Sequence, residues 1–231
     1  MATLDDDGVL TPSVRGGGTI IPFVIASVIA LAFVVFDLGL SPSPKGLTGE
    51  GGPIETASAL LWIYAAAALV WFAPRTVLGQ GWQFPALFVL FAARELDMDK
   101  AYLSEGILKA RLYSGDAPIG EKLIGLIVIA LILTIAIRLF RRNLGDWLRG
   151  LGRAAPWALT AGGALALAFV SKTIDGAGRK LEPLGIQLSD AVIAATGATE
   201  EWMELAFVLL AVLAVCLWAR SKLAPQQPSE N

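Results

Sequence analysis

The chain has 231 residues, of which 55% are hydrophobic and only 16% are charged, and its formal net charge is −2. A soluble domain needs more polar surface than this to cover its core, and so small a net charge gives no electrostatic footprint for nucleic-acid binding. The chain has no histidine and a single cysteine, Cys216. This excludes histidine-dependent hydrolases and an intramolecular disulfide. For the same reason we expect neither a zinc site nor a haem site.

The apolar residues are concentrated in long runs, which predicts an all-α, polytopic transmembrane helix bundle. A bilayer core of about 30 Å needs about 20 residues of helix, and about six runs reach or approach that length. We expect one membrane domain over residues 19–222, short interfacial helices in the outer loops, and disordered tails over residues 1–18 and 223–231. The expected spans are residues 20–40, 53–73, 82–96, 122–140, 155–170 and 201–219.

Proline and charge mark where these helices begin and end. Pro53 suits the first turn of the second helix, and Pro74 stops that helix. The third run is short and passes straight into the charged segment 94–100, so it crosses the membrane only if this segment continues it as a polar helix buried in protein. The apolar spacing in residues 101–117 predicts an amphipathic interfacial helix, and residues 185–195 are expected to form another short helix at the membrane.

The distribution of arginine predicts the orientation of the chain. Residues 138–153 carry five arginines and one acid, Asp146, and the positive-inside rule places such a loop in the cytoplasm. Each side of the membrane has nine lysines or arginines, but the outer side holds 15 of the 20 acids. Six alternating spans then place both termini in the cytoplasm, and the expected location is the inner membrane of a bacterium.

Ionisable residues gather at the helix ends that are predicted to lie on the outer side. Charges at membrane depth are costly, and they are functional candidates by default. Glu95 and Asp99 are four residues apart, as are Glu200 and Glu204, so each pair is expected to share a helix face and to need a neutralising base or cation. The candidate ligand-binding or ion-pair residues are Glu55, Arg94, Glu95, Asp99, Lys100, Lys172, Asp175, Glu201 and Glu204.

Some of these residues also have a purely structural explanation. Glu55, Glu200, Glu201 and Glu204 are expected to lie in the first turns of helices, where the helix dipole favours an acid by about 0.3–1 kcal/mol. Capping therefore explains these four better than chemistry does. The segment 94–100 is different, because it follows a helix C-terminus, where acids are unfavourable. It fits a structural ion-pair network and a binding site equally well.

The available side chains limit the chemistry that such a cluster could perform. Carboxylates without histidine or thiolate suit hard divalent cations such as Mg²⁺, Ca²⁺ and Mn²⁺. If a metal ion binds, its ligands are expected among Glu55, Glu95, Asp99 and Glu204. The sequence lacks the paired aspartate series of membrane enzymes that act on lipid phosphates, and it lacks the G-x-S-x-G, H-E-x-x-H and P-loop motifs.

Three motifs carry a resemblance to a family of proteins. They are EGGPIETA at residues 50–57, FAARELDMDK at 91–100 and EEWME at 200–204. The chain resembles small multi-pass inner-membrane proteins of bacteria whose function is unassigned. This resemblance spans most of the membrane region and implies no activity, but it directs attention to Glu55, Glu95, Asp99, Lys100 and Glu204.

The sequence therefore favours a non-enzymatic role as an accessory or transport protein. In this interpretation the cluster binds a cation or a polar ligand, or it holds a membrane or periplasmic protein partner or a second copy of the chain. The alternative is a divalent-metal-dependent membrane enzyme that acts on a lipid-linked substrate or a phospholipid. Membrane lipids are partners in both cases.

Overall fold

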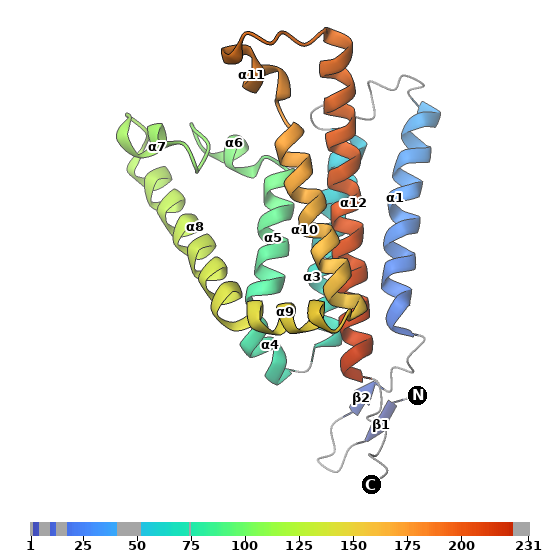
Figure 1. Ribbon diagram of the computed structural model, residues 1–231. Coiled ribbons are helices and arrows are strands. Elements are labelled where there is room, and N and C mark those ends of the chain that lie inside the picture. The colour runs from blue at the N-terminus through green and yellow to red at the C-terminus, as the bar shows by residue number, and fades with distance from the viewer. Residues whose placement is uncertain (1, 5–9, 13–17, 41–51, 74, 224–231) are drawn as a thin grey trace.

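The structure is a bundle of long helices joined by short ones (Figure 1). It is a computed structural model that describes residues 2–4, 10–12, 18–40, 52–73 and 75–223. Most of the expected N-terminal tail, residues 41–51 with Glu50, and residues 224–231 therefore lie outside the described residues. Within the N-terminal segment, strands β1 (Ala2–Leu4) and β2 (Leu10–Pro12) pair in antiparallel fashion, with Thr3 opposite Thr11.

The helices of the bundle follow one another in alternating directions (Figure 1). The long ones are α1 (Ile21–Leu40), α3 (Pro53–Phe72), α5 (Gln83–Glu95), α8 (Ile119–Arg138), α10 (Pro156–Ile174) and α12 (Asp190–Leu223). The short ones are η1 (Gly18–Ile20), α4 (Arg75–Gly81), α6 (Met98–Tyr102), α7 (Ala110–Ser114), η2 (Leu139–Asn143), α9 (Leu144–Gly152), α11 (Ala177–Leu181) and η3 (Glu182–Leu184).

Four helical stretches are long and apolar enough to cross a membrane. They are Pro53–Phe72, Ile119–Gly152, Pro156–Ile174 and Asp190–Lys222. The apolar part of α1, Ile21–Phe36, is shorter, and α5 has only 13 residues. The prediction of a helical membrane protein is confirmed in this form. Helix α5, which corresponds to the third expected span, falls short of the length a bilayer requires, whereas α1 as a whole has 20 residues.

Three local predictions are corrected by the structure. Residues 94–100 do not continue the third helix, because α5 ends at Glu95 and Asp97 takes a left-handed conformation with φ of 45° before α6 begins. Residues 101–117 do not form one amphipathic helix, since the end of α6, an irregular segment and α7 replace it. Residues 190–195 are not a separate short helix but the start of α12, which has 34 residues.

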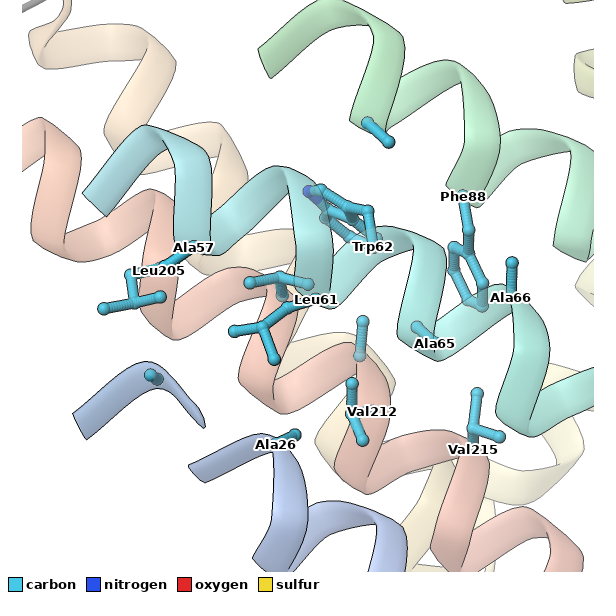
Figure 2. Packing of buried hydrophobic residues seen from close by; sticks show 14 of the residues in the cluster. Ala26, Ala57, Leu61, Trp62, Ala65, Ala66, Phe88, Leu205, Val212 and Val215 are labelled. Atoms are coloured by element: carbon cyan, nitrogen blue, oxygen red, sulfur yellow. The ribbon is translucent and has the colours of Figure 1, made fainter. Parts of the chain in front are cut away.

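The core of the bundle forms where α3 packs between α1, α5 and α12. Small residues on α3, such as Ala57 and Ala65, are fully buried and allow the helices to approach closely. Figure 2 shows Trp62 and Phe88 between α3 and α5, and Leu61 on the side of α3 that faces α12. This packing fixes the relative positions of α3, α5 and α12, which carry most of the charged cluster described below.

A polar junction joins α8 to the start of α5 at the other end of the bundle. The buried amide of Gln83 donates to Asn143 Oδ1 at 2.9 Å. Arg138 donates from Nη2 to the carbonyl of Gln80 at 3.0 Å, and its guanidinium lies over the ring of Trp82 at 5.1 Å from the centroid. Arg138 Nε also donates to Gln83 Oε1 at 3.4 Å, so Arg138 has a structural role at this junction.

Candidate functional site

The candidate site lies at the end of the bundle where α3 begins and where α5 and α10 end (Figure 1). Glu55 is in the first turn of α3, Glu95 is the last residue of α5, and Lys172 is in the last turn of α10. The glutamates of the EEWME motif come from α12, which passes alongside. Because α3 and α12 run opposite to α5 and α10, residues far apart in the sequence meet at one level.

Glu204 is the centre of the ion-pair network. Its Oε1 lies 2.7 Å from Lys172 Nζ and 3.4 Å from Arg94 Nη2. One carboxylate oxygen of α12 therefore binds cations from both α10 and α5. Lys172 Nζ also lies 2.9 Å from Glu200 Oε1, which confirms that Glu200 and Glu204 share a helix face and are neutralised by a base. Glu204 is 12% exposed, so this network is largely shielded by protein.

Glu95 is the most buried acid of the cluster, with 7% of its side chain exposed. Its Oε1 accepts a hydrogen bond from Arg94 Nη1 at 3.1 Å. The same guanidinium also serves Glu204, so the two carboxylates share one cation. Glu95 additionally interacts electrostatically with Glu204 and Glu55, which are like charges. A buried carboxylate in this setting carries a large desolvation cost, which the attraction of Arg94 and Lys172 offsets only in part.

Glu201 adds another acid without adding a base. It is partly buried, and it interacts electrostatically with Glu204, Glu55, Glu200 and Glu95. Among the residues that the structure describes, no lysine or arginine lies within ion-pair distance of Glu201. The capping explanation for Glu201 and Glu204 is wrong, because α12 begins at Asp190, more than two turns earlier. Only Glu55 lies in the first turn of its helix as expected.

The cluster has more acids than bases. Among the described residues, five glutamates (Glu55, Glu95, Glu200, Glu201 and Glu204) interact with one another, and the ion pairs of Glu95, Glu200 and Glu204 are made with two cations, Arg94 and Lys172. Asp175 lies at its edge, 3.6 Å from Lys172 Nζ. Arg94 and Lys172 are about half exposed, so the cluster reaches the protein surface on the side of these two residues. The arrangement favours the entry of a further positive charge.

Aromatic side chains close the cluster toward the interior of the bundle. Trp62 follows Glu55 by two helical turns on α3, Phe91 precedes Glu95 by one turn on α5, and Phe207 follows Glu204 by about one turn on α12. The ring centroids of Trp62 lie 4.7 Å from Phe91 and 4.8 Å from Phe207. The site is therefore open to the surface on one side. On the other side it is bounded by the packed rings of Trp62, Phe91 and Phe207, which we call the aromatic floor.

Two buried hydroxyl groups lie near this level of the bundle. Ser58 follows Glu55 by one turn on α3, and Ser171 precedes Lys172 on α10. Both side chains are buried, and neither oxygen has a hydrogen-bond partner among the described residues. They add polar groups to an otherwise apolar interior.

Two predicted residues have local partners on α6. Asp99 Oδ2 accepts a hydrogen bond from the backbone N–H of Ile107 at 3.3 Å and has no ion pair with a described residue. Lys100 Nζ lies 2.8 Å from Asp97 Oδ2. The expected shared face of Glu95 and Asp99 is wrong, because the helix breaks at Asp97 between them. The remaining seven predicted residues belong to the cluster or to its edge.

The four carboxylates predicted as a possible metal set do not form one site. Asp99 faces the loop after α6, whereas Glu95 and Glu204 share Arg94. Across the part of the chain that the structure describes, no group of three or more histidine, cysteine, aspartate or glutamate side chains is arranged to hold a metal ion. The glutamates of the cluster are instead interleaved with the two cations.

Sequence reasoning overlooked the aromatic floor beneath the cluster and the junction around Gln83. Helical spacing could have identified the floor, since its rings recur at intervals of three, four and seven residues from the glutamates. No comparable signal marks Gln83, because its partners Asn143 and Arg138 come from a distant part of the chain.

Comparison of the chain with protein-family models, with curated proteins and with solved structures finds no match. Function is therefore inferred from the geometry of the cluster and from its position at one end of a membrane bundle.

Proposed function

We propose that the chain is a six-pass protein of the bacterial inner membrane whose cluster binds a positively charged group. In this proposal α1 and α5 complete the membrane domain beside the four longer spans. The arginine-rich segment and both termini lie in the cytoplasm, and the cluster lies on the outer side. The role is non-enzymatic, and the bound group is an amine or guanidinium that belongs to a ligand or to a partner protein.

The observation that carries this proposal is the excess of carboxylates around a shared cation. Glu95 is buried, yet Arg94, its only ion-pair partner among the described residues, also binds Glu204. Glu201 is partly buried among like charges. An additional cation would reduce this repulsion, so its binding to the folded protein is favoured by the electrostatics of the site.

The aromatic floor favours binding over conduction. A path through the bundle from the cluster would have to pass Trp62, Phe91 and Phe207, whose rings are in mutual contact. The cluster is therefore suited to receive a ligand or a partner from one side of the membrane. No observation among the described residues favours the metal-dependent enzyme, whose expected ligands are not assembled.

Thermal unfolding of the detergent-purified protein tests the proposal. Agmatine, which carries a guanidinium and an amine, is the probe, and Mg²⁺ and Mn²⁺ are tested separately after treatment with EDTA. We expect agmatine to raise the midpoint, since a ligand present at a hundredfold excess over its Kd stabilises the native state by about 2.7 kcal/mol. Glu95→Gln should abolish this rise, because it removes the buried carboxylate charge while keeping the shape of the side chain.

The matched control is Glu105→Gln. Glu105 pairs with Lys109 and Arg111 in the segment between α6 and α7, outside the cluster. This variant should respond to agmatine as the wild type does. An unchanged midpoint with agmatine, or a rise that persists in Glu95→Gln, would contradict the proposal. A rise with Mg²⁺ or Mn²⁺ alone that Glu95→Gln abolishes would replace it with the metal-dependent alternative.

A further inference from the structure

The opposite end of the bundle carries a second charged surface, formed around α9. Helix α9 lies across this end, roughly perpendicular to the long helices (Figure 1). It is held against α10, because Trp147 Nε1 donates to the carbonyl of Ala158 at 3.0 Å. We call the basic residues here the arginine surface. Its members are Arg141, Arg142, Arg149, Arg153, Arg220 and Lys222.

The two ends of the molecule differ in how their cations are satisfied. At the cluster end, five of the eight described cations have an ion pair with an acid, namely Arg94, Lys100, Lys109, Arg111 and Lys172. The other three are Lys122 and Lys180, which donate to backbone carbonyls, and Arg179. On the arginine surface only Arg149 has such a pair, with Asp146. Its other members are exposed and have no ion pair with a described residue.

Apolar side chains accompany these unpaired cations. Leu148 on α9 is 52% exposed, and Phe140 on η2 is 70% exposed. Trp147 and Leu151 point instead toward α10, where a side chain at Gly162 would lie within 3.7 Å of both. Helix α9 thus combines a face packed on protein, exposed apolar groups and exposed arginines. Such a combination is typical of a helix that lies in the membrane interface among lipid headgroups.

We propose that the arginine surface binds the phosphate headgroups of anionic phospholipids. Exposed arginines without an ion pair are free to take an anionic partner, and the guanidinium group matches phosphate through two parallel hydrogen bonds. The exposed apolar side chains beside them fit the acyl region just below the headgroups. The surface lies at the far end of the bundle from the carboxylate cluster, so this interaction is independent of the function proposed for that cluster.

The experiment compares thermal unfolding in nanodiscs of phosphatidylcholine with unfolding in nanodiscs of phosphatidylcholine and phosphatidylglycerol. The wild type should unfold at a higher temperature when phosphatidylglycerol is present, and high salt should remove the difference. The combined variant Arg141→Gln, Arg142→Gln and Arg153→Gln should lose the rise. Its affinity for phosphatidylglycerol should fall on the order of a hundredfold, since each basic residue near an anionic leaflet contributes about fivefold. In pure phosphatidylcholine it should unfold like the wild type.

The matched control removes charge at the opposite end through Lys109→Gln and Arg111→Gln, and it should keep the rise. The combined variant Arg141→Lys, Arg142→Lys and Arg153→Lys should keep part of the rise, which separates loss of charge from loss of folding. Equal midpoints of the wild type in both lipids, or equal loss of the rise in the control, would overturn the proposal. So would an equal rise produced by inorganic phosphate in pure phosphatidylcholine, because the surface would then bind soluble phosphate.

Discussion

At the residue scale, the cluster shows how one side chain organises several helices. Glu204 binds Lys172 and Arg94, and Arg94 in turn binds Glu95. Charged hydrogen bonds of this kind contribute more than neutral ones, but the acids outnumber the bases that satisfy them. The apolar packing beneath the cluster must therefore contribute the part of the folding stability at this end of the bundle that the ion pairs do not. Trp62 is the centre of that packing, since its ring contacts Phe88, Phe91 and Phe207.

Replacing Trp62 with alanine should strongly destabilise the bundle. The side chain is 1% exposed, and truncating a buried tryptophan costs about 3–5 kcal/mol through lost contacts and the cavity left behind. The measurement is the free energy of unfolding in mixed micelles with increasing denaturing detergent. Trp71→Ala is the control, because Trp71 lies on the same helix but is 75% exposed. Equal losses in both variants would show that Trp62 does not hold α3, α5 and α12 together.

At the scale of elements, the ends of helices decide what the cluster contains. The break after Glu95 turns Asp99 away from the cluster and toward the loop before α7. The early start of α12 places Glu201 and Glu204 within a helix, where neither the dipole nor capping explains them. At the other end, α9 depends on a close approach to α10, which Gly150 makes possible.

Substituting Gly150 by alanine should displace α9 from α10. A Cβ atom at this position would lie 2.8 Å from Ala158 Cβ and from the ring of Trp157, which is closer than real contacts allow. Overpacking of this kind costs about 1–3 kcal/mol. Gly152→Ala is the control, because no atom lies within 4 Å of the corresponding Cβ. The free energy of unfolding of each variant checks the prediction, and similar values for the two would contradict it.

At the scale of the whole molecule, charge is segregated between the two ends of the bundle. The carboxylate cluster occupies one end and the arginine surface the other (Figure 1). Such asymmetry sets the orientation of a membrane protein, since basic segments are retained in the cytoplasm. In the proposed orientation, the two proposed interactions lie on different sides of the membrane, with the cationic group outside and the anionic lipid inside.

Cysteine labelling in intact cells tests this orientation. In a Cys216→Ala background, Lys109→Cys should react with a membrane-impermeant maleimide added from outside, because the segment between α6 and α7 lies at the cluster end. Gly145→Cys on α9 should react only after the cells are permeabilised, and both positions are exposed at the protein surface. Labelling of position 145 in intact cells, with position 109 protected, would reverse the orientation.

Helix boundaries were predictable where a local signal marked them. Pro53 and Pro156 begin α3 and α10 within a residue of the predicted starts. Helix boundaries were not predicted where neither a proline nor a break in the apolar run marked them. The left-handed turn at Asp97 interrupts a sequence that reads as continuous helix, and α12 begins before its apolar run does. Conformational preferences of single residues are too weak to reveal such features without their tertiary contacts.

The sequence by itself determined that the chain is helical and that several of its helices are apolar enough to cross a membrane, because in lipid the backbone must satisfy its own hydrogen bonds within each long apolar run. It also identified Glu55, Glu95 and Lys172 as charged residues at helix ends, although Glu201 and Glu204 lie within a helix. Only the tertiary structure decided that Glu204 meets both Arg94 and Lys172, and that Asp99 does not join them. In such helices, the face toward lipid and the face toward protein are both apolar. Side-chain packing therefore determines which helices become neighbours, and no local sequence pattern records that packing.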